Sequence, residues 1–191
     1  MSLKQKVIAI DGPSASGKGT VASRVAEALG FLYLDSGALY RLTALYAQKQ
    51  NVAWTDEDAV STLAETLPAQ FEGSVVLLNG DDVSEQIRTE AIGMGASAVA
   101  QLPKVRTALL QRQRDFLTEK GLVADGRDIG SVIFPDAALK IFLTASANVR
   151  AQRRAKQLGI PCEGVAFERI LSDIEARDEA DRRRPVAPLK Q

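Results

Sequence analysis

The sequence predicts an α/β protein in which a parallel β-sheet is flanked by helices. Residues 7–10, Val-Ile-Ala-Ile, and residues 31–34, Phe-Leu-Tyr-Leu, are short apolar runs that end at an aspartate, which is typical of strands buried on both faces. Between them, four apolar residues repeat with helical spacing before Gly30: Ala22, Val25, Ala26 and Leu29. Strand, loop, helix and strand in this order form a βαβ unit, which requires parallel strands.

The middle of the chain alternates helical and hairpin patterns. Residues 55–67 predict a helix, with Thr55 and Asp58 as a capping box. The dipeptide Asn79-Gly80 between short β-type runs, 75–78 and 81–83, predicts a hairpin. A hairpin within a βα pattern indicates an insertion on the parallel core.

The second half returns to the α/β pattern. Pro103 opens a predicted helix that extends to Lys120. Residues 122–124 and 139–143 predict two further core strands, residues 146–158 predict a basic helix, and an apolar stripe around Phe167 and Ile174 predicts a last helix. We expect one compact α/β unit with an insert near residues 68–100.

The composition excludes several classes of function. Among 191 residues, 24 lysines and arginines balance 24 aspartates and glutamates, so no overall positive charge is available to bind a nucleic-acid polymer. The chain has no histidine, which removes histidine-based triads, general bases and metal sites. Its one cysteine, Cys162, cannot form an internal disulfide, and no stretch approaches the ~20 apolar residues of a membrane span. We therefore expect a reduced, cytoplasmic protein without a membrane partner.

The most specific motif is a glycine-rich loop directly after the first predicted strand. Its residues are Gly12, Pro13, Ser14, Ala15, Ser16, Gly17, Lys18, Gly19 and Thr20. Two glycines five positions apart let successive N–H groups turn toward phosphate oxygens, Lys18 reaches the β- and γ-phosphates, and the next helix points its positive end at the same place. The motif predicts nucleotide binding, as opposed to a strand-to-helix turn with an incidental lysine. Because Gly19 follows the lysine, Thr20 stands one position late for a metal ligand.

Two segments place polar residues directly after predicted strands. In residues 35–41, Ser36 and Arg41 could hold a second phosphate, and a helix N-cap with a solvated arginine is an equally good interpretation. In residues 125–128, Asp125 stands where an acidic residue holds Mg²⁺ through water in such folds, and a loop salt bridge is the alternative.

Two arginine-rich stretches also admit two interpretations. Arg150, Arg153 and Arg154 share one helix face and form either a lid over a triphosphate or a solvated surface. Residues 177–184 are the densest charge run, which by itself favours a solvated helix end with i,i+4 pairs. Phosphoryl transfer depends mainly on positioning and positive charge, so a chain rich in arginine suits it.

Taken together, the motifs closely resemble the bacterial cytidylate kinase family. The resemblance covers nearly the whole chain in order, through residues 12–20, 35–41, 78–88, 125–128, 134–137 and 177–189. It implies transfer of the γ-phosphoryl group of ATP to CMP or dCMP with Mg²⁺, on a P-loop nucleoside-monophosphate-kinase fold with a short lid. It also implies that CMP, dCMP and ATP are the partners of a monomeric protein.

The resemblance also implies the residues of the site. Together with the loop motif, it leads us to expect Lys18, Arg127, Arg154 and Arg177 as catalytic residues and the loop 12–20 as the ATP site. Thr20 is the candidate metal ligand, one position late in the motif. The monophosphate contacts fall on Ser36, Arg41, Arg127 and Arg184, the cytosine contacts on Ser97, Arg106 and Asp128, and the sugar contacts on Arg177 and Asp181. A carboxylate at Asp128 suits its role, because cytosine offers an amino donor where uracil has a carbonyl.

The expected layout is a single P-loop kinase unit over residues 1–191. The core covers 1–35, 104–145 and 164–191, the monophosphate-binding insert covers about 36–103, and the lid covers about 146–163. Two features depart from the family. Gly93-Met94-Gly95 replaces ordinary helix formers, so we expect a broken helix before Ser97. Relatives continue past the position of Gln191 with a further strand and helix that we expect to be absent here.

Two other functions stay open on the residues alone. One is a P-loop kinase for another small substrate, such as UMP, AMP or a non-nucleotide alcohol. The other is a regulatory module that binds a nucleotide without turnover.

Overall fold

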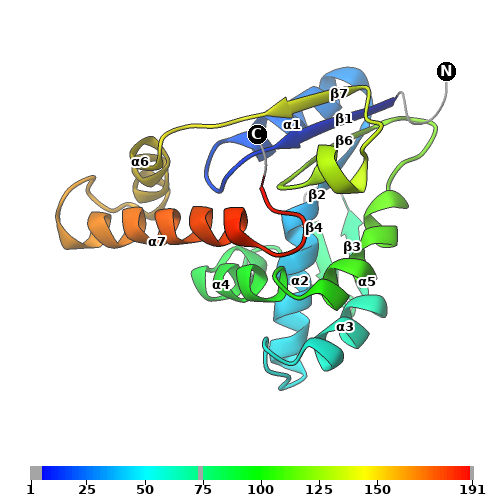
Figure 1. Cartoon of the computed structure of the whole chain (residues 1–191), viewed down its shortest axis with the longest axis horizontal. Coiled ribbons are helices and arrows are strands. Elements are labelled where there is room, and N and C mark those ends of the chain that lie inside the picture. Colours follow the sequence, from blue (N-terminus) through cyan, green and yellow to red (C-terminus); the bar gives the residue numbers. More distant parts are fainter. Residues whose placement is uncertain (1–5, 73–74, 190–191) are drawn as a thin grey trace. The chain divides into compact units, whose positions relative to one another are not determined.

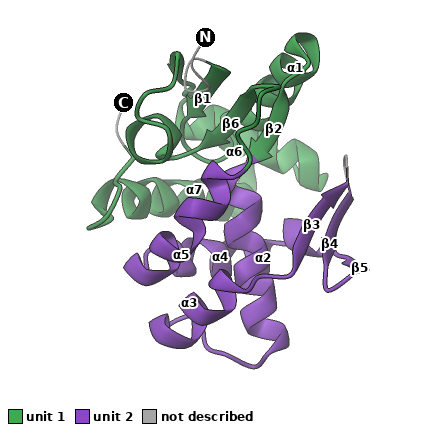
Figure 2. Cartoon of the chain, turned by 90° about the vertical axis from the view of Figure 1, so that its right-hand side faces the viewer, with its two compact units in different colours: residues 1–34, 116–191 green, residues 35–115 purple. Residues whose placement is uncertain are grey.

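The computed structural model describes residues 6–72 and 75–189 (Figure 1). The chain divides into two compact units (Figure 2). Residues 1–34 and 116–191 form the first, which we name the sheet unit, and residues 35–115 form the second, the helical unit. Gln191, the last residue of the expected layout, lies outside the described residues.

Over the residues that the structure describes, the sheet unit is built on four strands in the order β2-β6-β1-β7. These strands are β1 (Val7–Asp11), β2 (Leu32–Asp35), β6 (Leu122–Gly126) and β7 (Leu139–Phe142). β1 pairs in parallel with both β6 and β7, which confirms the predicted parallel sheet. Because β1 and β6 lie in the middle of the sheet, their side chains are buried, as their continuous apolar sequences indicate.

One face of β1 packs against α1 (Lys18–Leu29). Of the predicted apolar stripe, Ala22 and Ala26 are buried and Val25 is partly buried, whereas Leu29 is 51% exposed. Ile10 on β1, Val123 on β6 and Ala26 on α1 belong to one buried cluster. The helix ends where expected, at Gly30, which has a φ of 65° and donates its N–H to the last turn. Helices therefore flank a parallel sheet, and the predicted fold class is confirmed.

Two long helices complete the sheet unit (Figure 1). They are α6 (Ala147–Leu158) and α7 (Gly164–Arg183). Ser146 caps α6 by accepting the N–H of Val149. The two helices pack through small and apolar side chains, among them Ala151 and Phe167. None of the helices in the described part of the chain is long and apolar enough to cross a membrane.

In its described residues, the helical unit has four α-helices and a small antiparallel sheet (Figure 2). The helices are α2 (Ser36–Lys49), α3 (Glu57–Glu65), α4 (Glu90–Val99) and α5 (Pro103–Arg114), and a short 3-10 turn covers Gln86–Arg88. The sheet has the order β3-β4-β5, formed by Ala69–Glu72, Val75–Leu78 and Asp81–Asp82. Asn79 and Gly80 have φ values of 53° and 85°, the conformation of a type I′ hairpin turn, so the predicted hairpin is confirmed.

Three local predictions are wrong. Asp56, not Thr55, caps α3, because its carboxylate accepts the N–H of Ala59. The helix that begins at Pro103 ends at Arg114 rather than at Lys120. The expected break at Gly93-Met94-Gly95 is absent, because the backbone of α4 is helical throughout.

Candidate active site

The glycine-rich loop, residues 12–17, connects β1 to α1 within the sheet unit. Its backbone has positive φ values at Gly12, Ala15 and Gly17, of 155°, 55° and 95°. A Cβ atom at Gly12 would collide with the carbonyl oxygen of Leu143, so neither the conformation nor the space at this position tolerates a side chain. The turn itself therefore requires glycine at the start of the motif.

The N-terminus of α1 is suited to an anion. Its N-cap residue is Gly17, which has no side chain to accept the first N–H groups, and its first turn carries no acidic residue. The positive end of the helix dipole lies at the same place. The hydroxyl oxygens of Ser14 and Ser16 are buried, and neither has a hydrogen-bond partner among the described residues. These hydroxyls add two polar groups for a phosphate to satisfy.

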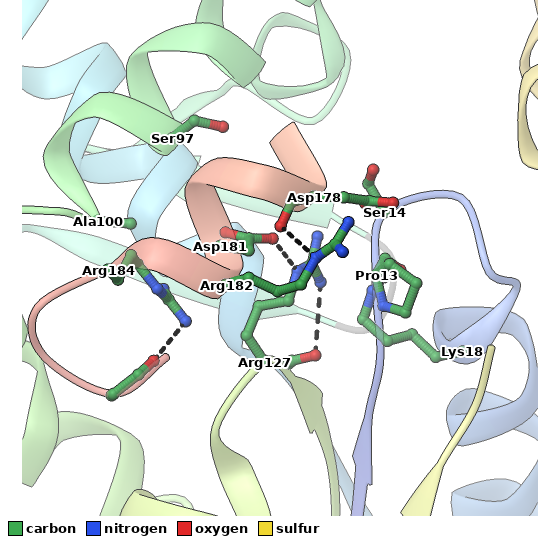
Figure 3. A network of polar contacts seen from close by, with 12 residues as sticks. Pro13, Ser14, Lys18, Ser97, Ala100, Arg127, Asp178, Asp181, Arg182 and Arg184 are labelled. Atoms are coloured by element: carbon green, nitrogen blue, oxygen red, sulfur yellow. Dashed lines mark hydrogen bonds and ion pairs between the residues drawn. The ribbon is translucent and has the colours of Figure 1, made fainter. Parts of the chain in front are cut away.

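Lys18 begins α1 and is only 9% exposed. Its ammonium donates to the carbonyl oxygen of Pro13 at 3.2 Å, which places its charge over the loop (Figure 3). A phosphate bound in the loop would lie beside this charge.

Arginines of α6 hold the outer side of the loop. Arg150 donates to the carbonyl oxygen of Ser14 at 3.2 Å, and Arg153 donates to that of Ser16 at 2.8 Å. Carbonyl and N–H groups of one peptide unit point in opposite directions. Because Arg150 and Arg153 bind the carbonyl oxygens of Ser14 and Ser16, the N–H groups of the same peptide units point away from the arginines. These N–H groups are then available to a ligand.

Arg150 is itself fixed by a buried ion pair with Asp178 of α7. Both terminal guanidinium nitrogens, Nη1 and Nη2, contact the carboxylate, and Nη1 lies 2.9 Å from Oδ1. Its Nε also donates to the carbonyl oxygen of Ala145 at 2.9 Å. Arg150 is 3% exposed, so the alternative of a solvated surface is wrong for this residue.

The charge run 177–184 forms part of the sheet unit's polar network. Arg127 donates through Nε to Asp181 at 2.7 Å, and Arg184 donates to the carbonyl oxygen of Ala187 at 2.7 Å (Figure 3). Asp178 and Arg184 are buried at 7% and 6% exposure. A fully solvated helix end is thus also wrong, although Arg182 and Arg183 are exposed and Arg183 pairs with Glu179 at the expected i,i+4 spacing.

Two carboxylates lie at the ends of neighbouring strands. Asp125 on β6 accepts a hydrogen bond from the Tyr33 hydroxyl at 2.7 Å. A Cβ atom at Gly19 would lie 3.9 Å from its Oδ1, so Asp125 is beside the first turn of α1. Asp11 on β1 accepts the N–H groups of Ile129 and Gly130 at 2.8 Å each. Burial raises the pKa of Asp11, and these two hydrogen bonds partly oppose that shift.

In the helical unit, Ser36 opens α2 and is held by a residue that the sequence does not single out. Asp35 caps the helix by accepting the N–H of Ala38. The Ser36 hydroxyl donates to Oε1 of Gln113 on α5 at 2.6 Å, and Gln113 in turn donates to the carbonyl oxygen of Leu109 at 3.2 Å. Gln113 is 1% exposed and fixes the Ser36 side chain from a different helix.

The Arg41 side chain lies against α4 at Gly93. Its guanidinium donates to the carbonyl oxygen of Ile87 at 2.9 Å. A Cβ atom at Gly93 would be 3.3 Å from its Nη1, a distance tighter than ordinary contact. Gly93 therefore makes room for the guanidinium, and the sequence gives no local signal of this.

The three residues expected to contact cytosine each have different local contacts. Arg106 is 7% exposed, donates to the carbonyl oxygen of Ala100 at 3.1 Å and stacks over the Tyr40 ring, with 5.7 Å from guanidinium carbon to ring centroid. Ser97 donates its hydroxyl to the carbonyl oxygen of Gly93 at 3.1 Å. Asp128, in the sheet unit, is 3% exposed.

The structure links only some of the expected site residues directly. In the sheet unit, Arg127 and Asp181 form a pair, while Arg154 and Arg177 are half-buried on α6 and α7. In the helical unit, Ser36 and Arg41 both lie on α2. That the two sets serve one nucleotide stays a prediction.

A strand, a loop of this conformation, a buried lysine over it and an uncapped helix N-terminus define a P-loop protein of the phosphoryl-transfer class. Comparison with known families makes the class specific: the model of the family described as "Cytidylate kinase" matches residues 8–191. The chain belongs to the cytidylate kinase family, and the resemblance seen in its motifs is confirmed.

Curated relatives agree with the family model. The cytidylate kinase of Neisseria meningitidis serogroup C is 80% identical over 98% of this chain and 86% of its own length. That of Chromobacterium violaceum is 60% identical over 97% of this chain and 83% of its own length. The crystal structure of TT1252 from Thermus thermophilus matches 96% of this chain and 86% of that chain, at 20% identity and with a TM-score of 0.44.

Proposed function

We propose that this protein transfers the γ-phosphoryl group of ATP to CMP and dCMP, producing ADP with CDP or dCDP. Family membership over residues 8–191 carries the proposal. The loop geometry supports it independently, because a buried lysine and an uncapped helix end suit the phosphates of a nucleotide.

ATP is proposed to bind with its phosphates in the loop 12–20. The unsatisfied hydroxyls of Ser14 and Ser16 and the charge of Lys18 fit this ligand. Among the described residues no group of three or more acidic side chains could hold a metal ion. This fits Mg²⁺, which commonly keeps its waters and binds through one or two protein groups plus substrate phosphates.

Two groups of this chain are proposed to support Mg²⁺. Thr20 would offer its hydroxyl, and Asp125, beside the first turn of α1, would act through water. The ion supplies positive charge to the β- and γ-phosphates during transfer.

CMP is proposed to bind through arginines, hydroxyls and carboxylates. The monophosphate would contact Ser36, Arg41, Arg127 and Arg184, the cytosine Ser97, Arg106 and Asp128, and the sugar Arg177 and Asp181. The planar guanidinium fork matches phosphate oxygens. Arg127 donates through Nε to Asp181 and through Nη1 to the carbonyl oxygen of Gly126 at 3.4 Å, and these two contacts orient its guanidinium group.

The proposed reaction needs no general base. An oxygen of the CMP phosphate attacks the γ-phosphorus, the bond to the β–γ bridging oxygen breaks, and ADP leaves with that electron pair. The second pKa of a phosphate monoester is ~6, so the attacking group is largely ionised at neutral pH. Lys18, Arg127, Arg154 and Arg177 would stabilise the charge on the oxygens of the moving group.

A coupled assay of ADP release tests the proposal against the open alternatives. The purified protein is given ATP and Mg²⁺ with CMP, dCMP, UMP, AMP or a non-nucleotide alcohol. We expect the highest kcat/KM with CMP and dCMP. A higher value with UMP, AMP or the alcohol would indicate another P-loop kinase, and no ADP with any acceptor would indicate a regulatory module.

We further propose that the protein works as a monomer in the cytoplasm. A single cysteine suits a reducing compartment, and the chain's proposed residues supply every role in the reaction. Light scattering on a sizing column should give the mass of one chain, 20.5 kDa.

A further inference from the structure

We propose that Asp11 is a positioning residue whose carboxylate holds the segment carrying Arg127 and Asp128 against the phosphate loop. The inference rests on the proposed function, which gives Arg127 and Asp128 their contacts with CMP. Asp11 ends β1 and directly precedes Gly12, the first residue of the loop.

The contact is a matched pair of buried hydrogen bonds. Oδ1 of Asp11 accepts the N–H of Ile129, and Oδ2 accepts the N–H of Gly130, both at 2.8 Å. Asp11 is 8% exposed. One N–H for each oxygen is an arrangement that a carboxylate satisfies and an amide cannot, because an amide has one acceptor atom.

The segment needs acceptors at this place. Ile129–Ile133 is a short π-helical turn, in which the carbonyl oxygen of Asp128 accepts the N–H of Val132 at 2.9 Å and of Ile133 at 3.2 Å. The first N–H groups of a helical turn have no acceptor within it. Asp11 supplies those acceptors from a strand 118 residues away in sequence.

The chain contacts the end of β1 on both sides of Arg127 and Asp128. On one side, Gly126 pairs with Asp11 in the sheet, and its carbonyl oxygen accepts the N–H of Gly12 at 3.3 Å. On the other side, Ile129 and Gly130 bind the Asp11 carboxylate. Arg127 and Asp128 are the residues between these points, so their backbone is fixed to the strand that leads into the phosphate loop.

The close packing of the turn supports the same conclusion. A Cβ atom at Gly130 would lie 3.4 Å from Cβ of Ala9. Ala9 and Asp11 point to the same face of β1, because side chains alternate along a strand. Asp11 and Ala9 together therefore form the surface on which the turn rests, opposite the face that packs on α1.

The substitution Asp11→Asn tests the inference, with Asp173→Asn as the matched control. Asparagine keeps the shape but leaves one buried N–H facing an NH₂ group, so the turn must shift. We expect kcat/KM for CMP to fall about tenfold or more. We also expect the CMP-to-UMP ratio of kcat/KM to fall, because Asp128 moves. Asp173 is exposed on α7, and its variant should keep both values.

The outcomes separate the inference from the proposed function. If the wild type fails to phosphorylate CMP, the proposed function is wrong. If the wild type is active and a folded Asp11→Asn variant keeps both its rate and its ratio, Asp11 is only structural and the inference is wrong.

A second measurement uses the wild type alone, in case the variant does not fold. The amides of Ile129 and Gly130 should exchange with solvent as slowly as those of β1, and their NMR signals should shift when CMP is added. Fast exchange, or signals that do not respond to CMP, would overturn the inference.

Discussion

Lys18 is held over the phosphate loop by a hydrogen bond to the Pro13 carbonyl, which a phosphate oxygen can replace. Because its charge is already in place, we expect Lys18→Ala to lower kcat for CMP phosphorylation by about 10²–10³. Steady-state kinetics with saturating ATP check this. Lys120→Ala, at an exposed turn, is the control and should keep the wild-type rate. A Lys18→Ala enzyme with normal kcat contradicts the role given to the lysine.

Asp128 tests how the base is recognised. The carboxylate is 3% exposed and would accept from the cytosine amino group. We expect Asp128→Asn to reduce the preference for CMP over UMP by about 1–3 kcal/mol, because the amide can also donate to the uracil carbonyl. The ratio of kcat/KM for the two substrates measures this change. An unaltered ratio means that another group reads the base.

The sequence predicts individual residues well where the signal is local. Gly12 and Gly17 lie in one short motif, so their spacing is enough to predict the loop. Gln113 cannot be predicted in this way, because it lies 77 residues from Ser36, the residue whose hydroxyl it binds. Only folding brings such pairs together, and neither Gln113 nor Ile129 carries a motif of its own.

Among the helices, α6 and α7 are joined by the ion pair of Arg150 and Asp178, whose side chains are 4% and 11% exposed. Removing one partner leaves a buried charge. We therefore expect Arg150→Met to lower the free energy of unfolding by about 3–5 kcal/mol. The KM for ATP should also rise, because Arg150 no longer binds the loop carbonyl of Ser14.

A double variant separates the two effects in this prediction. Arg150→Met with Asp178→Leu leaves no unpaired charge, so denaturant unfolding should show recovered stability while the KM for ATP stays high. If the single variant unfolds like the wild type, the pair does not join the helices.

For helix α4, we expect a glycine-to-alanine substitution to change stability in the direction opposite to that predicted by helix propensity. Gly95 lies under the Trp54 ring, and a Cβ atom there would be 2.5 Å from Cζ2. Propensity alone predicts that Gly95→Ala stabilises the helix by about 1 kcal/mol. We expect the reverse, a loss of about 1–3 kcal/mol from the collision. Thermal unfolding checks the sign, with Met94→Ala at the exposed neighbouring position as the control.

The same packing explains which elements the sequence could predict. The strands and helices of the sheet unit have strong apolar periodicity, and their positions follow from it. The predicted break in α4 is wrong because Trp54 and Arg41 occupy the space beside its glycines. β3 is missed because Ala69–Glu72 becomes a strand through pairing with β4, while Arg112 binds the carbonyl oxygens of Leu67 and Ala69 at 2.7 and 2.9 Å.

For the whole molecule, the proposed Mg²⁺ site determines how the ion is held. In the proposal only two groups of this chain, Thr20 and Asp125, support it. We expect calorimetric titration to detect Mg²⁺ binding only when ATP is present, since the phosphates supply most of its ligands. Chelation by EDTA should stop phosphoryl transfer and leave CMP binding intact. Tight binding of Mg²⁺ to the protein alone contradicts this.

The parallel sheet and the family are both predictable from sequence, because order and spacing of motifs persist along the chain. The division into two compact units at 34/35 and 115/116 depends on contacts between distant segments, which no single motif encodes.

Direct observation of the transferred group is the measurement that tests the central claim. Phosphorus NMR can follow the nucleotides in a mixture of ATP, CMP and Mg²⁺ after addition of the protein. The account predicts that signals of ADP and CDP grow in equal amounts without inorganic phosphate. Release of inorganic phosphate without CDP, or unchanged ATP, would contradict it.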